Sequence, residues 1–250
     1  MLVVGAYQPV APEPQPPMVE GADEDPAVTK VQESEMQPVG GYGIQGVPAA
    51  AFFLIPEDGS EAVFERGFDE EGVLTIETAP GRYVSGLEVV DMESKQAWRA
   101  RQGVVQLPLI PGLVDVSDIL ILKSGVTLPE TLEEAIPQVR PSVRVKSGER
   151  FPVVWEAYGL RINEPVRVTL GFTSGRPGFL SRVGEFLGIV EPDNPVELIF
   201  EDRGPDLVQT LFRAIEFQLP ELDPGEYTLH LKIDLAGRES VVRSRPVIVE

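Results

Sequence analysis

The chain has 250 residues, enough for two domains of ordinary size, and 42% of them are hydrophobic, which suffices for packed cores. Its 21 basic and 40 acidic side chains give a net charge of −19, and so acidic a surface repels phosphate backbones, so we expect no nucleic-acid partner. No cysteine is present, which excludes disulfides, thiolate catalysis and cysteine-ligated zinc.

The first 41 residues are rich in proline and acidic side chains. Seven of the 24 prolines fall there, together with the acidic run at 23–25. Such a segment buries too little apolar surface to offset the entropy that ordering costs, so we expect a disordered tail over residues 1–41. No basic residue precedes Lys30, which is atypical of a signal peptide, and no apolar run reaches the roughly 18 residues of a membrane span.

Short apolar segments separated by turn residues begin after this tail and predict a first β-sandwich over residues 42–122. Its expected strands are 51–55, 61–68, 73–78, 83–91, 96–107 and, buried on both faces, 117–122. Residues 123–141 predict a proline-bounded linker. Within it, residues 129–136 predict one or two helical turns, because acidic side chains favour the N-terminal end of a helix.

A second series of alternating segments predicts a second β-sandwich over residues 142–250. Its expected strands are 151–158, 166–172, 196–201, 210–219, 225–234 and 240–249. Trp155 is expected in the core. Residues 177–190 break the period of two and predict a short amphipathic helix, whose apolar side chains either cap the sandwich or contact a partner. The candidate contact residues are Phe179, Leu180, Val183 and Phe186.

The tetrapeptide Pro-Gly-x-Tyr occurs at 80–83 and again at 224–227, each time at the head of an alternating strand. A tyrosine at this corner of immunoglobulin-like domains bonds through its hydroxyl to nearby backbone. The repeat therefore predicts an all-β chain of two tandem immunoglobulin-like or fibronectin III-like sandwiches. It also predicts that the hydroxyl of Tyr227 reaches backbone around residues 219–222.

The chain offers few residues with catalytic chemistry. His230, the single histidine, is out of phase with the inward residues of its strand, so we expect it to be solvated and part of neither a triad nor a metal site. Acidic turns such as 69–71 and 201–202 provide oxygen ligands for calcium, but the ordered 12-residue calcium loop is absent. No nucleophile elbow or phosphate-binding loop occurs. We expect no enzyme, no cofactor and no metal.

Two parts of the chain resemble bacterial GWxTD domain-containing proteins. Ser-Asp-Ile-Leu at 117–120, a proline-rich spacer and Phe-Pro-Val-Val-Trp-Glu-Ala-Tyr-Gly-Leu at 151–160 are similar to the region that follows the domain named after that motif. The hairpin at 222–238 is similar to the last hairpin of those proteins. The resemblance covers about residues 78–250, and the Gly-Trp-x-Thr-Asp motif itself is absent, so no activity is carried over. It implies a tandem sandwich region of an exported bacterial protein.

These observations predict a non-enzymatic structural or interaction module of a bacterial envelope or secreted protein, in contact with a protein partner or with adjacent domains of a larger chain. The expected location is periplasmic or extracellular, with the cytoplasm as the alternative. The alternative function is a carbohydrate- or peptide-binding sandwich. The two functions differ in their surfaces, because a binding module needs an exposed aromatic platform or a concave pocket.

Overall fold

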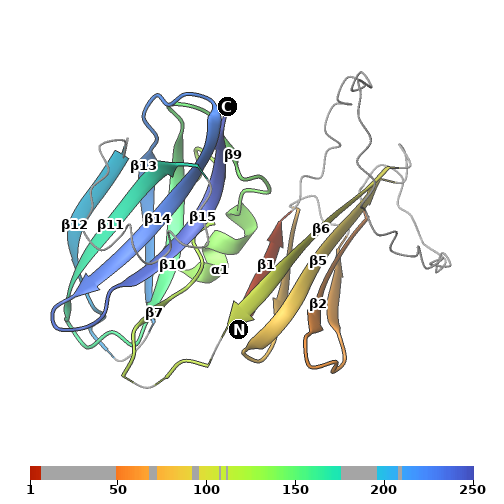
Figure 1. The fold of residues 1–250 in the computed structure, drawn as a ribbon, viewed down its shortest axis with the longest axis horizontal. Coiled ribbons are helices and arrows are strands. Elements are labelled where there is room, and N and C mark those ends of the chain that lie inside the picture. The colour runs from red at the N-terminus through yellow and green to blue at the C-terminus, as the bar shows by residue number, and fades with distance from the viewer. Residues whose placement is uncertain are drawn as a thin grey trace, which may run out of the picture.

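The computed structural model describes residues 1–6, 49–67, 72–91, 96–106, 108–110, 112–175, 196–207 and 210–250. These residues form fifteen strands, one short α-helix and one 3-10 turn, so the described fold is all-β, as predicted. They lie in two units side by side (Figure 1). No described helix has both the length and the apolar character needed to span a membrane.

The first unit consists of two antiparallel sheets. One pairs β1 (Leu2–Ala6) with β4 (Val73–Glu77). The other has four strands, which are, in order, β3 (Val63–Gly67), β2 (Ala49–Pro56), β5 (Gly81–Asp91) and β6 (Gln96–Gln106). Their inner faces enclose a core of Ala50, Phe52, Leu54, Leu74, Ile76, Tyr83 and Val89.

Strand β1 corrects the prediction of a disordered tail over residues 1–41. Its Val3 packs against the core of the first unit, and the amino group of Met1 donates to the carbonyl oxygen of Thr78 at 2.7 Å. The apolar residues 1–6 therefore behave as a strand. The proline-rich composition of the longer segment obscured this short run in the sequence. Residues 7–41 lie outside the described residues.

The second unit is a larger pair of sheets. One contains β13 (Leu211–Gln218), β10 (Arg150–Tyr158) and β7 (Asp115–Val116), and β8 (Leu120–Ile121) also pairs with β10. The other has the order β12 (Val196–Arg203), β11 (Pro165–Ser174), β14 (Gly225–Leu235), β15 (Val241–Val249) and β9 (Arg144–Val145). The core lies between them and includes Trp155, which is 2% exposed, as expected.

The expected last strand of the first sandwich, residues 117–122, belongs by pairing to the second unit. Ile119 and Ile121 are buried in the core of that unit, and β8 pairs with β10. The apolar run was correctly predicted to be buried, but its sequence contains nothing that selects between the two neighbouring cores. The structure therefore places residues 115–122 on the far side of the boundary from residues 42–106.

The two units repeat one strand order. In the first, β1 pairs with β4, and β3, β2, β5 and β6 form the second sheet. In the second, β10 pairs with β13, and β12, β11, β14 and β15 follow the same order. The second unit adds β7 and β8 beside β10 and the short β9 beside β15. The repeat seen in the sequence is thus a repeat of six strands.

The segment between the units is packed. Thr131 caps α1 (Leu132–Ala135) by accepting the Glu134 backbone N–H, and the 3-10 turn Ile136–Gln138 follows, which confirms the predicted helical turns. Ala135 is fully buried and Val139 is 3% exposed, in one apolar cluster with Leu122 and Val154.

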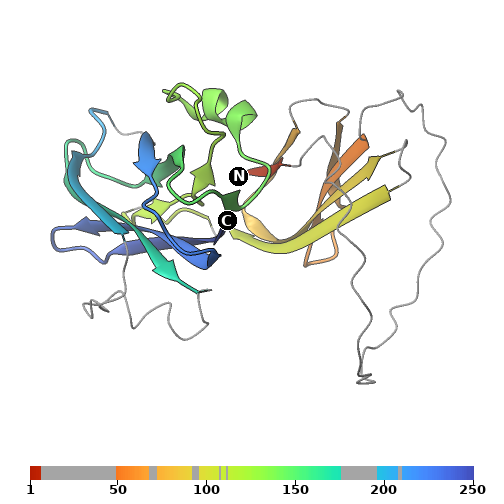
Figure 2. The same ribbon diagram turned by 90° about the horizontal axis from the view of Figure 1, so that it is seen from above.

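Partly buried residues of the first unit pack against this cluster. They are Val4 and Ala6 of β1 and Val73 of β4. Both views show α1 on the side of the second unit that faces β1 (Figures 1 and 2). The segment 123–141 therefore differs from a simple linker, since it helps to form an apolar contact between the two units, which we call the inter-unit cluster.

Candidate interaction surface

The residues predicted to contact a partner, Phe179, Leu180, Val183 and Phe186, lie outside the described residues, as does the predicted helix at 177–190. Their role as a contact surface therefore stays a prediction.

His230 is held between two strands and differs from the solvated residue that we predicted. One ring nitrogen lies 2.7 Å from Thr173 Oγ1 on β11, and the other lies 2.8 Å from Ser244 Oγ on β15. Burial lowers the pKa of this imidazole to about 4. The residue is on the outward side of β14, as its phase indicated, but it is half-buried there. A neutral imidazole bonded to two hydroxyls suits a structural role.

The described residues contain no group of three or more histidine, aspartate or glutamate side chains that could hold a metal ion. A shallow hollow occurs at Met1, Leu2, Glu77 and Thr78, where the two-stranded sheet ends. It lacks the apolar lining and converging polar groups of a small-molecule site.

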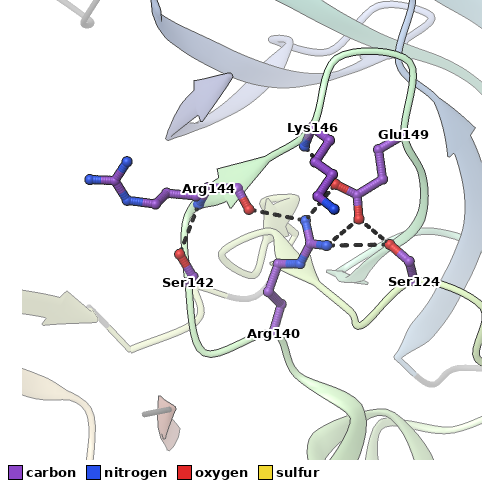
Figure 3. Close-up of polar contacts among 6 residues, drawn as sticks. All are labelled: Ser124, Arg140, Ser142, Arg144, Lys146 and Glu149. Carbon is purple, nitrogen blue, oxygen red and sulfur yellow. Dashed lines mark hydrogen bonds and ion pairs between the residues drawn. The ribbon is translucent and has the colours of Figure 1, made fainter. Parts of the chain in front are cut away.

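A polar cluster joins the segment between the units to the start of the second unit (Figure 3). The Arg140 guanidinium forms an ion pair with Glu149, and the two side chains are 15% and 14% exposed. It also donates to the carbonyl oxygen of Arg144 at 3.1 Å and to Ser124 Oγ at 3.3 Å. The Lys146 backbone N–H donates to Glu149 Oε2 at 2.7 Å.

Burial raises the pKa of the Glu149 carboxyl, but hydrogen bonds from Arg140, Ser124 and a backbone N–H outweigh that effect, so its pKa lies below the usual value. The carboxylate is therefore ionised at neutral pH, and donors of the same chain already bind its oxygens. We conclude that this cluster stabilises the fold rather than binding a ligand.

Further arginines attach residues 112–119 to the C-terminal hairpin. Arg243 forms an ion pair with Asp115, and Arg245 donates to the carbonyl oxygen of Ile119 at 2.7 Å. Arg238 pairs with Glu164 at 2.9 Å and donates to the carbonyl oxygen of Gly112 at 2.8 Å. These contacts explain why the segment before β8 packs on the second unit.

The surface that most resembles a binding site is the solvent side of the four-stranded sheet of the first unit. Two neighbouring rows of its register cross the whole sheet from β3 to β6. One row is Phe64, Phe53, Gly86 and Arg101, and the other is Arg66, Ala51, Glu88 and Arg99. We call this side of the sheet the arginine face.

The aromatic part of the arginine face is organised by a glycine. The Phe53 ring lies directly over Gly86, where a Cβ atom would come within 2.3 Å of two ring carbons. Phe64 is 61% exposed on the adjacent strand, with the Arg66 guanidinium 5.3 Å from its ring centroid. Two aromatic side chains therefore lie on neighbouring strands of this face, with a cation beside the exposed one.

The charge of the arginine face is opposite to that of the whole chain. Arg66, Arg82, Arg99 and Arg101 lie on it with one carboxylate, Glu88, which pairs with Arg99 at 2.7 Å. Among the described side chains on this side of the four strands, four positive charges against one negative charge give +3, on a chain of net charge −19. The alternation of Arg99 and Arg101 along the strand was readable from the sequence. The strand register that brings the two phenylalanines beside them was not.

No protein-family model matches this chain, and no curated protein sequence matches it. The resemblance to GWxTD domain-containing proteins therefore stays a prediction.

Proposed function

We propose that this protein is a non-enzymatic module that holds other parts of a bacterial envelope or secreted protein at a fixed spacing, through two tandem immunoglobulin-like sandwiches. The inter-unit cluster carries this proposal. Leu122, Ala135 and Val154 are fully buried in it, and residues of β1 and β4 pack against them. An apolar contact of this kind restrains the relative motion of two units, whereas a solvated linker leaves them free.

Two features support the immunoglobulin-like assignment of the units. In each unit a tyrosine hydroxyl donates to the carbonyl oxygen four residues earlier, at the start of the next-to-last strand. That is the position of the tyrosine corner in such domains. In the second unit the short strand β9 pairs in parallel with the last two residues of the last strand, β15.

The assignment to the C-terminal region of GWxTD domain-containing proteins, and with it a periplasmic or extracellular location, is supported by the motifs at 117–120, 151–160 and 222–238. The absence of cysteine agrees with either side of a membrane, so the location depends on that resemblance alone.

A second function, a peptide- or carbohydrate-binding module, is favoured by one specific observation. On the arginine face, Phe64 is 61% exposed and lies beside solvent-exposed arginines. Aromatic and arginine side chains are the residue types that dominate binding surfaces. The two functions are compatible, because a rigid module can also dock a partner.

The test of the spacing function is to disrupt the inter-unit cluster from the side of the first unit. In the double variant Val4→Asp/Val73→Asp, small-angle X-ray scattering should show a larger maximum dimension than in the unchanged protein, and calorimetry should resolve two transitions. The control Ile199→Asp, at a residue that is 55% exposed, should change neither result.

Folding of each unit is followed separately in this experiment, because Trp98 packs on the first core and Trp155 lies in the second. Fluorotryptophan labelling gives one ¹⁹F signal per unit, and both signals should keep their native shifts in the double variant. If the unchanged protein already scatters as two units that tumble freely, the spacing function is wrong.

A further inference from the structure

We propose that the outer edge of β6 and the adjoining arginine face bind an extended acidic segment of a partner protein, which adds to the sheet as a fifth strand. This inference gives the docking part of the proposed function a site and a chemistry. It rests on the docking part of that function and not on the spacing part.

The repeat of strand order relates the edge of β6 to that of β15. In the second unit the last long strand, β15, carries β9 on its outer side, with Ile248 opposite Arg144 and Val249 opposite Val145. The equivalent strand of the first unit is β6. Among the described residues, no strand pairs with the outer edge of β6 along residues 97–105. β9 covers only the last two residues of β15, which correspond to residues 105 and 106 of β6. The edge of β6 along residues 97–105 is therefore identified by its own lack of a partner strand among the described residues.

An edge strand of this length is a template for another strand. Its unpaired N–H and C=O groups can bond to any extended backbone, and proteins usually blunt such edges with proline, charge or a covering segment. Residues 97–105 contain no proline. They do carry charge, as Arg99 and Arg101, and both side chains point to the solvent side of the sheet. The charge therefore selects which strand can add.

The side chains of β6 specify the chemistry of the added strand. On the solvent side they are Ala97, Arg99, Arg101, Gly103 and Val105, in that order. Directly opposite residues of neighbouring strands interact in pairs, so carboxylates two positions apart on the partner would meet Arg99 and Arg101. Gly103 leaves open space beside Arg101, so a partner side chain has room opposite it. Val105 is 55% exposed, so an apolar partner side chain would fit opposite it.

The charges around the edge favour an acidic partner. Arg101 and Arg82 make no ion pair with a described residue, and Arg99 has Glu88 alone. A cationic surface on a chain of net −19 attracts acidic segments and repels basic ones. It also disfavours pairing with a second copy of β6, because two such strands side by side would bring their arginines together.

An anionic polysaccharide would also meet the arginines and Phe64. It has no backbone amides, however, and so leaves the β6 edge unused. The unpaired edge of β6 among the described residues therefore favours a polypeptide, and the experiment includes a polysaccharide to separate the two.

The test uses a capped nine-residue peptide of alternating Glu and Thr, with the same peptide carrying Gln for Glu as the charge control. Isothermal titration calorimetry of the full chain should detect binding of the Glu peptide, and binding at least tenfold weaker of the Gln peptide. The double variant Arg99→Gln/Arg101→Gln should weaken binding at least tenfold. The matched variant Arg150→Gln/Arg167→Gln removes two exposed arginines of the second unit and should change the affinity less than twofold.

Two further probes separate strand addition from simple charge attraction. Glu peptides with N-methyl groups on alternate residues, made in both phases, keep the charge but block the backbone bonds of one side, and one phase should abolish binding. Dextran sulfate is the polysaccharide probe. Equal binding of both methylated phases, binding of dextran sulfate without the Glu peptide, or no binding of the Glu peptide at millimolar concentration would each overturn the proposal. None of these outcomes bears on the scattering test of the spacing function.

Discussion

The phenol of Tyr227 donates a 3.0 Å hydrogen bond to the carbonyl oxygen of Asp223, four residues before it. Tyr83 has the same relation to Ala79, at 2.8 Å. Each bond joins the start of a long strand to the turn that precedes it, and each ring lies in the core of its own unit. The contact occurs one residue later than the range 219–222 expected from the sequence.

We expect Tyr227→Phe and Tyr83→Phe each to lower the free energy of unfolding by about 0.5–1.5 kcal/mol, because each removes a partly buried hydrogen bond between a core tyrosine and the backbone. The two effects should add to within about 0.5 kcal/mol, since the rings lie in separate cores. Urea unfolding of both single variants and of the double variant measures this. Unchanged midpoints would show that the corners do not stabilise the units.

The ion pair of Arg140 with Glu149 should stabilise the protein more than an exposed pair does. Replacing Arg140 by Met leaves a sheltered carboxylate without its main partner, and we expect a loss on the order of 2 kcal/mol. Arg167→Met is the control, because its pair with Glu201 is 61% and 67% exposed and should contribute less than about 1 kcal/mol. Equal losses in both variants would contradict a stabilising role for the cluster.

The same pair predicts a pH dependence. The pKa of Glu149 is lower in the folded than in the unfolded chain, so its contribution is complete above the usual value of 4.5 and is lost as the pH falls through the folded pKa. Unfolding free energies measured at pH 7 and at pH 3 should therefore differ less in Glu149→Gln than in the unchanged protein. An unaltered pH slope in that variant would remove this interpretation.

The neutral His230 should make the stability of the protein depend on pH over a different pH range. Its folded pKa of about 4 lies below its usual value of 6.5, so the folded state resists protonation, and stability is complete above pH 6.5 and falls as the pH drops towards 4. Because the chain has one histidine, NMR titration of its ring reads this pKa without overlap. A pKa near 6.5 would show that the ring is solvated after all.

Replacement of His230 by Ala removes its contacts with Thr173 and Ser244, and we expect a loss of about 1–2 kcal/mol. The sequence alone indicated less than about half of one kcal/mol, the usual cost at an exposed strand position. The phase of β14 correctly indicated an outward side chain. It carried no information on the hydroxyls that the neighbouring strands place on both sides of the ring.

The strands themselves were largely readable from the sequence, because alternation and turn residues are local signals. The strand expected at 151–158 is Arg150–Tyr158, and that expected at 240–249 is Val241–Val249. Features that depend on distant pairing were missed. The inter-unit cluster joins Val4 to Val154, and the arginine face joins Phe64 to Arg101, and no local pattern specifies either relation.

Gly86 offers a direct test of how the arginine face is built. A Cβ atom there would lie 2.3 Å from the Phe53 ring, so Gly86→Ala must push the ring outwards into solvent. The far end of a ring can move, and we therefore expect a modest loss of about 1–2 kcal/mol rather than unfolding. Gly103→Ala is the matched control on the adjacent strand, because nothing lies within 4 Å of its Cβ position, and it should be nearly neutral.

The double variant Phe53→Ala/Gly86→Ala completes this cycle. Once the ring is absent, adding the Gly86 methyl group should cost almost nothing, so the two substitutions should be strongly coupled. Urea unfolding of the four proteins measures the coupling, and ¹⁹F labelling of Trp98 confirms that the first unit remains folded. If Gly86→Ala is as costly without the Phe53 ring as with it, the glycine is required by the backbone of β5, and the aromatic surface of the arginine face does not depend on it.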